Sequence, residues 1–105
     1  MAIMVSLTLR NVPIELFEEV NRELGASENP PKGLIVHFVH PVDTDGVRIV
    51  DVWASEQAHD AFDDDTDPPG ALAGLLRKQG LGPPQFVSRD VVEVQALVVG
   101  STGGQ

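Results

Sequence analysis

The chain has 105 residues, 42% of them hydrophobic and 22% charged, and sixteen acidic against seven basic side chains give a formal net charge of −9. This length provides one domain with one hydrophobic core. So acidic a surface repels phosphate backbones and anionic lipid, which argues against nucleic-acid and membrane-surface roles. Because cysteine is absent, we expect no disulfide, thiolate nucleophile or cysteine-ligated metal. Without a signal-peptide pattern or a bilayer-length apolar run, we expect a cytoplasmic protein.

The first half of the chain predicts a strand, a helix and a hairpin. Residues 3–9 are rich in β-branched and leucine side chains, which is typical of a strand. A helix that ends near residue 24 is predicted by apolar residues at helical spacing, namely Ile14, Phe17, Val20 and Leu24. Residues 34–40 and 47–53 predict two strands, and Asp45-Gly46 between them is a strong signal for a two-residue hairpin turn.

The second half predicts two helices and a last strand. Ser55 is an N-cap candidate for a helix that buries Phe62, and a short helix follows the proline pair at 68–69. Residues 86–99 predict the last strand. The order β-α-β-β-α-β is the ferredoxin-like arrangement, an α+β fold with a four-stranded antiparallel sheet. We expect residues 1–99 to form a single domain and residues 100–105 a disordered tail.

The two-residue turn also assigns each hairpin residue to a face of the sheet. One face mixes bulky and polar side chains: Val36, Phe38, His40, Ile49, Asp51 and Trp53. The other face is more uniformly aliphatic: Ile35, His37, Val39, Arg48, Val50 and Val52. Two helices cover only one face, and an uncovered apolar face is larger than soluble monomers tolerate. We therefore expect the mixed face in a cleft under the helices and the aliphatic face in a homodimer interface.

The chain resembles the dimeric α+β barrel proteins, nearest the small actinobacterial proteins allied to the antibiotic biosynthesis monooxygenases. The resemblance spans residues 3–99 and is carried by Gly33-Leu-Ile-Val-His37, the Asp45-Gly46 turn, and Val50-Asp-Val-Trp-Ala-Ser-Glu56 followed by Phe62. In that group a strand ends in tryptophan and a helix starts at the next serine or aspartate, as at Trp53 and Ser55. The resemblance implies a barrel of two back-to-back sheets, one from each subunit, with a cleft between sheet and helices in each.

No single reaction follows from the resemblance, because the group includes oxygenases, isomerases, haem-binding enzymes and proteins without known activity. In the monooxygenases and their haem-degrading relatives, the tryptophan that matches Trp53 lines the substrate cleft. The oxygenases carry an asparagine four residues before it, where this chain has Ile49. Trp53 is therefore predicted either as a cleft wall or as a core residue that packs a helix onto the sheet.

The three histidines have different expected roles. The two-residue turn places His40 opposite Asp51, and a carboxylate beside an imidazole orients it as a general base. The alternative is a hydrogen bond that only satisfies both polar groups. His37 matches a histidine of the nearest relatives, but its parity puts it on the interface face with Arg48, as an interface hydrogen bond or a substrate contact. His59 is expected on the solvated side of an acidic helix.

Two functions remain open at this stage. The first is a monooxygenase-like enzyme that acts on a hydrophobic or aromatic molecule without a tightly bound cofactor. Its catalytic residues would be His40, Asp51 and Trp53, and its substrate-binding residues Phe38, Phe17, Phe62 and His37. The second is a non-catalytic ligand-binding or structural homodimer. An open cleft of about 300 Å³ or more favours a ligand. We expect no metal site, because the aspartate runs are fragments of metal-binding motifs.

Overall fold

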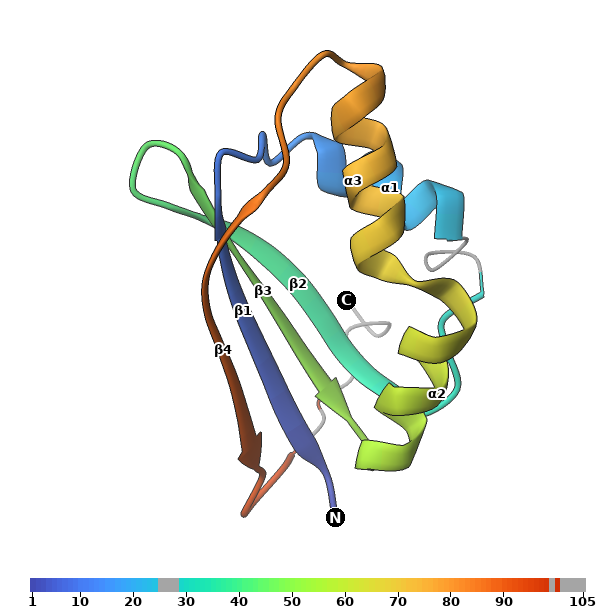
Figure 1. Cartoon of the computed structure of the whole chain (residues 1–105). Coiled ribbons are helices and arrows are strands. Elements are labelled where there is room, and N and C mark those ends of the chain that lie inside the picture. The colour runs from blue at the N-terminus through green and yellow to red at the C-terminus, as the bar shows by residue number, and fades with distance from the viewer. Residues whose placement is uncertain (25–28, 99, 101–105) are drawn as a thin grey trace.

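The computed structural model describes residues 1–24, 29–98 and 100 and contains a four-stranded antiparallel sheet in the order β2-β3-β1-β4 (Figure 1). The strands are β1 (Ile3–Arg10), β2 (Leu34–Val42), β3 (Gly46–Trp53) and β4 (Gln85–Glu93). The helices are α1 (Leu16–Leu24), α2 (Glu56–Thr66) and α3 (Pro68–Lys78). This order confirms the predicted ferredoxin-like α+β fold, and the additional helix α3 is longer than predicted, with 11 residues like α2.

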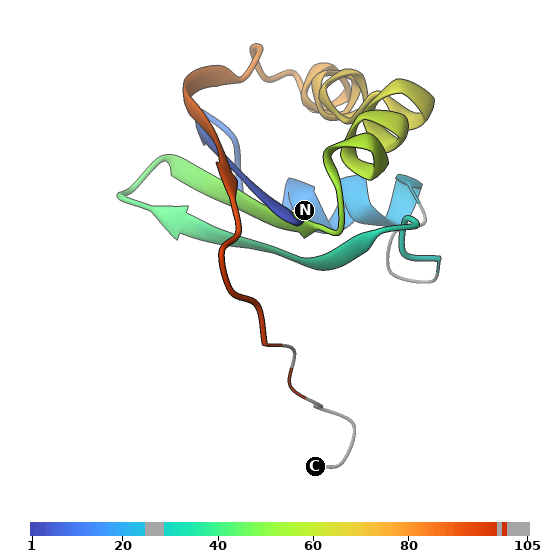
Figure 2. The ribbon, with the colours of Figure 1, turned by 90° about the horizontal axis from the view of Figure 1, so that it is seen from below.

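The helices lie on one side of the sheet, and the chain after β4 leads away on the opposite side from α2 and α3 (Figure 2). Alternation along β1 explains the arrangement, because Ile3, Val5 and Leu9 point toward the helices and are buried. Ser55 caps α2 as predicted, with its hydroxyl accepting a hydrogen bond from the Ala58 amide at 3.1 Å. Within the described residues, no helix combines the length and apolar character that a membrane span requires.

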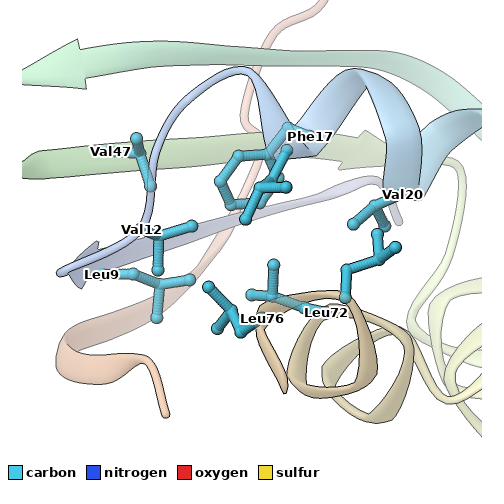
Figure 3. Packing of buried hydrophobic residues seen from close by; sticks show 9 residues of the cluster. Leu9, Val12, Phe17, Val20, Val47, Leu72 and Leu76 are labelled. Carbon is cyan, nitrogen blue, oxygen red and sulfur yellow. The ribbon is translucent and has the colours of Figure 1, made fainter. Parts of the chain in front are cut away.

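The core consists of two clusters on the helix-facing side of the sheet. The larger joins β1 and β3 to α1 and α3 (Figure 3), and its buried members are Leu9, Val12, Leu16, Phe17, Val20, Val47, Leu72, Leu75 and Leu76. The smaller lies near the start of α2 and joins Ile3, Val5 and Trp53, with Leu34, Ala58 and Phe62 packed against it. The larger cluster packs α1 and α3 onto the sheet, and the smaller cluster packs α2 onto the same face.

The β2–β3 turn differs from the two-residue turn that the sequence predicts. Val42 pairs with Gly46, so the turn comprises residues 43–45, and Asp43 adopts a left-handed conformation with φ 55°. A Cβ on Gly46 would lie 2.8 Å from the carbonyl oxygen of Val42. This glycine therefore permits a close approach between the strands and does not form the turn itself. Arg10 fastens the turn through an ion pair with Asp45 at 2.8 Å.

The longer turn shifts the strand register and moves β2 residues to the other face. His37 now pairs with Asp51, and Val39 pairs with Ile49, on the helix-facing side. The face assigned above to the dimer interface is therefore wrong for β2, since Val39 packs against the larger core cluster. On β3, Val50 lies as predicted on the side of the sheet away from the helices, where it pairs with Phe38. We call the side of the sheet away from the helices the outer face.

The last strand is shorter than predicted. β4 ends at Glu93, which pairs with Ile3 at the start of β1, and the Val94 amide makes one further bond to the Ala2 carbonyl at 2.9 Å. Beyond this point β1 offers no partner, so residues 94–98 leave the sheet. Of the predicted tail, residues 101–105 lie outside the described residues, so the boundary of the domain at residue 99 stays a prediction.

Candidate functional site

A cavity of about 510 Å³ lies between the sheet and the helices. Its walls come from both core clusters, with Val5, Leu9, Phe17 and Trp53 among the lining residues. The volume falls within the range of about 300–1,000 Å³ that small-molecule sites occupy. The cavity therefore exceeds the volume of about 300 Å³ above which the sequence analysis expects a ligand.

An imidazole–carboxylate pair lies in the sheet wall of this cavity. His37 on β2 and Asp51 on β3 are cross-strand partners, and His37 Nδ1 donates a hydrogen bond to Asp51 Oδ1. Both side chains are partly buried, at 27% and 22% exposure, and both line the cavity. A carboxylate at Nδ1 fixes the tautomer and ring orientation of the histidine, which is how enzymes position a general base.

The predicted His40–Asp51 pair is wrong. His40 pairs with Arg48 on the outer face, and its Nδ1 lies 3.0 Å from the carbonyl oxygen of Pro41. The predicted position of Phe38 is wrong for the same reason, because it pairs with Val50 and stacks on His40 at 6.2 Å between ring centroids. Neither side chain lines the large cavity. The three-residue turn accounts for both errors, since it exchanges the faces of Val36 and of the β2 residues that follow it.

Trp53 forms the end of the cavity below the start of α2. Its side chain is only 1% exposed, and its ring lies 5.5 Å from that of Phe62 and 5.7 Å from that of His59. Trp53 therefore combines the two predicted positions, because it packs α2 onto the sheet as a core residue and also lines the cavity. Its buried indole N–H has no hydrogen-bond partner among the described residues. The residue opposite it on β2 is Leu34.

His59 was expected at the surface, and this is wrong. It is 7% exposed, lines the cavity from α2, and places Nδ1 3.0 Å from Asp60 Oδ1 and Nε2 3.3 Å from Asp63 Oδ2. The helix period contained the missing signal, because His59 lies three residues before Phe62 and thus on its side of the helix. The acidic neighbours obscured that position, since they suggest a solvated face.

The sequence reasoning also overlooked the wall that β4 contributes. Phe86 and Arg89 line the cavity on the helix-facing side of this strand, where Arg89 pairs with Leu7 of β1. The side chains of β4 are exposed along its whole length. Only the strand register places Arg89 on this face, because Val91, two residues along β4, pairs with the buried Val5.

The side chains described in the structure include no group of three histidine, aspartate or glutamate residues arranged to hold a metal ion. The polar groups of the cavity are instead two imidazole–carboxylate sets, His37 with Asp51 and His59 with Asp63, together with Arg89. Such a lining can bind an apolar molecule and exchange a proton with it.

Solved structures with this architecture identify the class of fold. A protein from Caulobacter crescentus assigned as an antibiotic biosynthesis monooxygenase superposes with a TM-score of 0.63 at 21% identity, over 90% of this chain and 91% of that one. One from Deinococcus radiodurans, assigned likewise, gives 0.61 at 12% identity over 96% and 99%. SnoaB from Streptomyces nogalater, a cofactor-independent oxygenase, gives 0.59 at 13% identity over 92% and 96%.

This chain therefore has the fold of the antibiotic biosynthesis monooxygenase-like α+β proteins, as the sequence resemblance implied. No protein-family model and no curated protein sequence matches the chain. At these identities the likeness establishes the fold, and the chemistry has to be argued from the cavity itself.

Proposed function

We propose that this protein is a monooxygenase-like enzyme that acts without a cofactor on a hydrophobic, aromatic molecule bound between sheet and helices. The observation that carries the proposal is the imidazole–carboxylate pair of His37 and Asp51 in the wall of an apolar cavity of about 510 Å³. The fold shared with a cofactor-independent oxygenase supports the reaction type. In place of His40, we assign His37 as the base, Asp51 as its orienting partner, and Trp53, Phe17 and Phe62 as cavity walls.

The chemistry begins with removal of a proton from an acidic C–H group of the substrate by His37, while Asp51 stabilises the imidazolium that forms. The resulting carbanion gives electrons to dioxygen, which is the oxidant. One oxygen atom replaces the two hydrogens of the CH2 group as a carbonyl, and the other leaves with both hydrogens as water. The largely apolar walls lower the local dielectric constant, which strengthens the attraction between the carbanion and the imidazolium beside it.

Anthrone is a suitable probe, because its CH2 group between two aromatic rings is acidic and its body is apolar. In air-saturated buffer with a chelator, we expect dioxygen uptake and anthraquinone formation in equal amounts, at a rate proportional to protein concentration. An oxygen electrode and chromatography measure the two quantities. Binding of anthrone, followed by Trp53 fluorescence, without catalysed uptake would favour the non-catalytic ligand-binding alternative. Absence of binding would contradict both the enzyme and the ligand-binding alternative and would leave a structural homodimer.

We further propose that two copies of the chain pair through their outer faces. Phe38 and Val92 on this face are 47% and 49% exposed and are not covered by helices. Charge favours the same face, because Arg48 and Asp90 offset each other there while the chain as a whole carries −9. Two equally acidic chains approach with least repulsion where the local charge cancels.

Replacing Phe38 with aspartate is expected to convert the dimer to monomer at micromolar concentration, since it would bury an unpaired carboxylate in the interface. The monomer should keep its fold, because Phe38 is exposed within the single chain. Light scattering and circular dichroism measure the two properties. The matched control is Leu81→Asp, a similarly exposed apolar residue outside the sheet, which should leave the dimer intact. A wild-type monomer at this concentration would contradict the pairing.

A further inference from the structure

Arg89 stands out among the charged groups of the cavity. Four of the five ionisable side chains in the lining are engaged with each other, His37 with Asp51 and His59 with Asp63. The fifth, Arg89, has no ion-pair or hydrogen-bond partner anywhere in residues 1–24, 29–98 and 100. Arg89 is therefore the one cationic side chain in the described lining that is left for a bound molecule to pair with.

The position of Arg89 suits contact with a bound molecule. It lies on β4, at the side of the cavity where every strand residue is exposed, so its guanidinium can reach the opening without displacing a helix. Phe86, from the same strand, lines the same wall and is 57% exposed. Together they present an apolar ring and a cation to one ligand, and a guanidinium can bind a carboxylate through two parallel hydrogen bonds.

We infer that the cavity binds a hydrophobic anion, that is, an aromatic body carrying a carboxylate or phenolate whose charge pairs with Arg89. This inference rests on the proposed function and specifies its substrate class. Arg89 is two strands and two residues away from Asp51 in the sheet, which corresponds to about 12 Å between their Cα atoms. The ligand's anionic group thus lies at the β4 side, and its apolar body extends across β1 toward His37 and Asp51.

Three naphthalene derivatives of one size test this charge preference by calorimetry at pH 7: 2-naphthoate as anion, 2-naphthamide as neutral isostere and 2-(aminomethyl)naphthalene as cation. We expect the anion to bind about tenfold more tightly than the amide, the effect of one charge-assisted hydrogen bond in a partly covered site. The cation should bind most weakly. The preference for the anion should decrease with added salt.

Arg89→Gln should abolish the difference between naphthoate and naphthamide while leaving naphthamide binding unchanged, and Arg89→Lys should restore part of it. Arg77→Gln is the control, because it removes the same charge from the last turn of α3, outside the cavity lining. Equal binding of anion and amide to the wild type, or an unchanged preference in Arg89→Gln, would overturn the role of Arg89 and leave the ligand cavity standing. Failure of all three compounds to bind would overturn the proposed function as well.

Discussion

Replacing His37 with alanine is expected to lower kcat/KM for anthrone oxidation by about 10²–10⁴-fold, the usual contribution of a positioned general base. Substrate binding should change little, because the apolar walls that hold the ring system remain. The fold should tolerate the change, since His37 and Asp51 are 27% and 22% exposed and the remaining carboxylate can be hydrated. Steady-state oxygen uptake and a fluorescence binding titration separate these two effects.

His40→Ala is the matched control. This histidine lies on the same strand three residues later, but its side chain belongs to the outer face and does not line the large cavity. Its replacement should leave kcat/KM unchanged. Asp51→Asn should reproduce most of the His37 defect, because the amide cannot stabilise the imidazolium. If His37→Ala retains full activity, the pair is a structural hydrogen bond and not a base.

The element order could be read from the sequence because local signals agree with the fold. β1 alternates, Ser55 caps α2 through its hydroxyl, and α1 carries Phe17 and Val20 at helical spacing, so each segment specifies its own structure. The strand pairing then has few alternatives in a four-stranded sheet of this connectivity. The resemblance to the α+β barrel proteins pointed to the same fold.

The predicted partner of Asp51 is wrong for one reason, the length of the β2–β3 turn. Asp45-Gly46 resembles a two-residue hairpin turn, but Gly46 is the first residue of β3, where its missing Cβ lets the Val42 carbonyl approach. The longer turn shifts the partner of Asp51 by three positions, from His40 to His37. Because side chains alternate with a period of two, this odd shift also moves His40 to the outer face. The sequence therefore predicted a histidine–aspartate pair in the cleft but named the wrong histidine.

Two further cavity residues, His59 and Arg89, were not predicted from the sequence, because their positions depend on tertiary packing. His59 is surrounded by aspartates, and only the packing of α2 onto Trp53 shows that its ring faces inward. Arg89 belongs to an edge strand exposed on both faces, so no burial pattern marks which side meets the cavity. Its place in the cavity wall follows only from the register with β1, which a bulge between Thr8 and Leu9 interrupts.

Trp53→Ala is expected to reduce the free energy of unfolding by about 3–5 kcal/mol, the range for a large aromatic residue removed from a core. Trp53 is 1% exposed and is the central residue of the smaller cluster, where it contacts Phe62 and His59. Loss of the indole enlarges the cavity at the point where α2 rests on the sheet. The melting temperature should fall by more than about 10 °C for a domain of this size.

Trp53→Phe is the informative comparison, because it keeps an aromatic ring and removes only the second ring and the N–H. That N–H is buried without a partner among the described residues, and such a group costs about 1–3 kcal/mol. Its removal therefore offsets part of the lost packing, and Trp53→Phe should be at least about 2 kcal/mol more stable than Trp53→Ala. Denaturant unfolding followed by circular dichroism measures both variants without relying on tryptophan fluorescence. Equal destabilisation by phenylalanine and alanine would contradict this expectation, because it would show that a phenyl ring recovers none of the packing that the indole provides between α2 and the sheet.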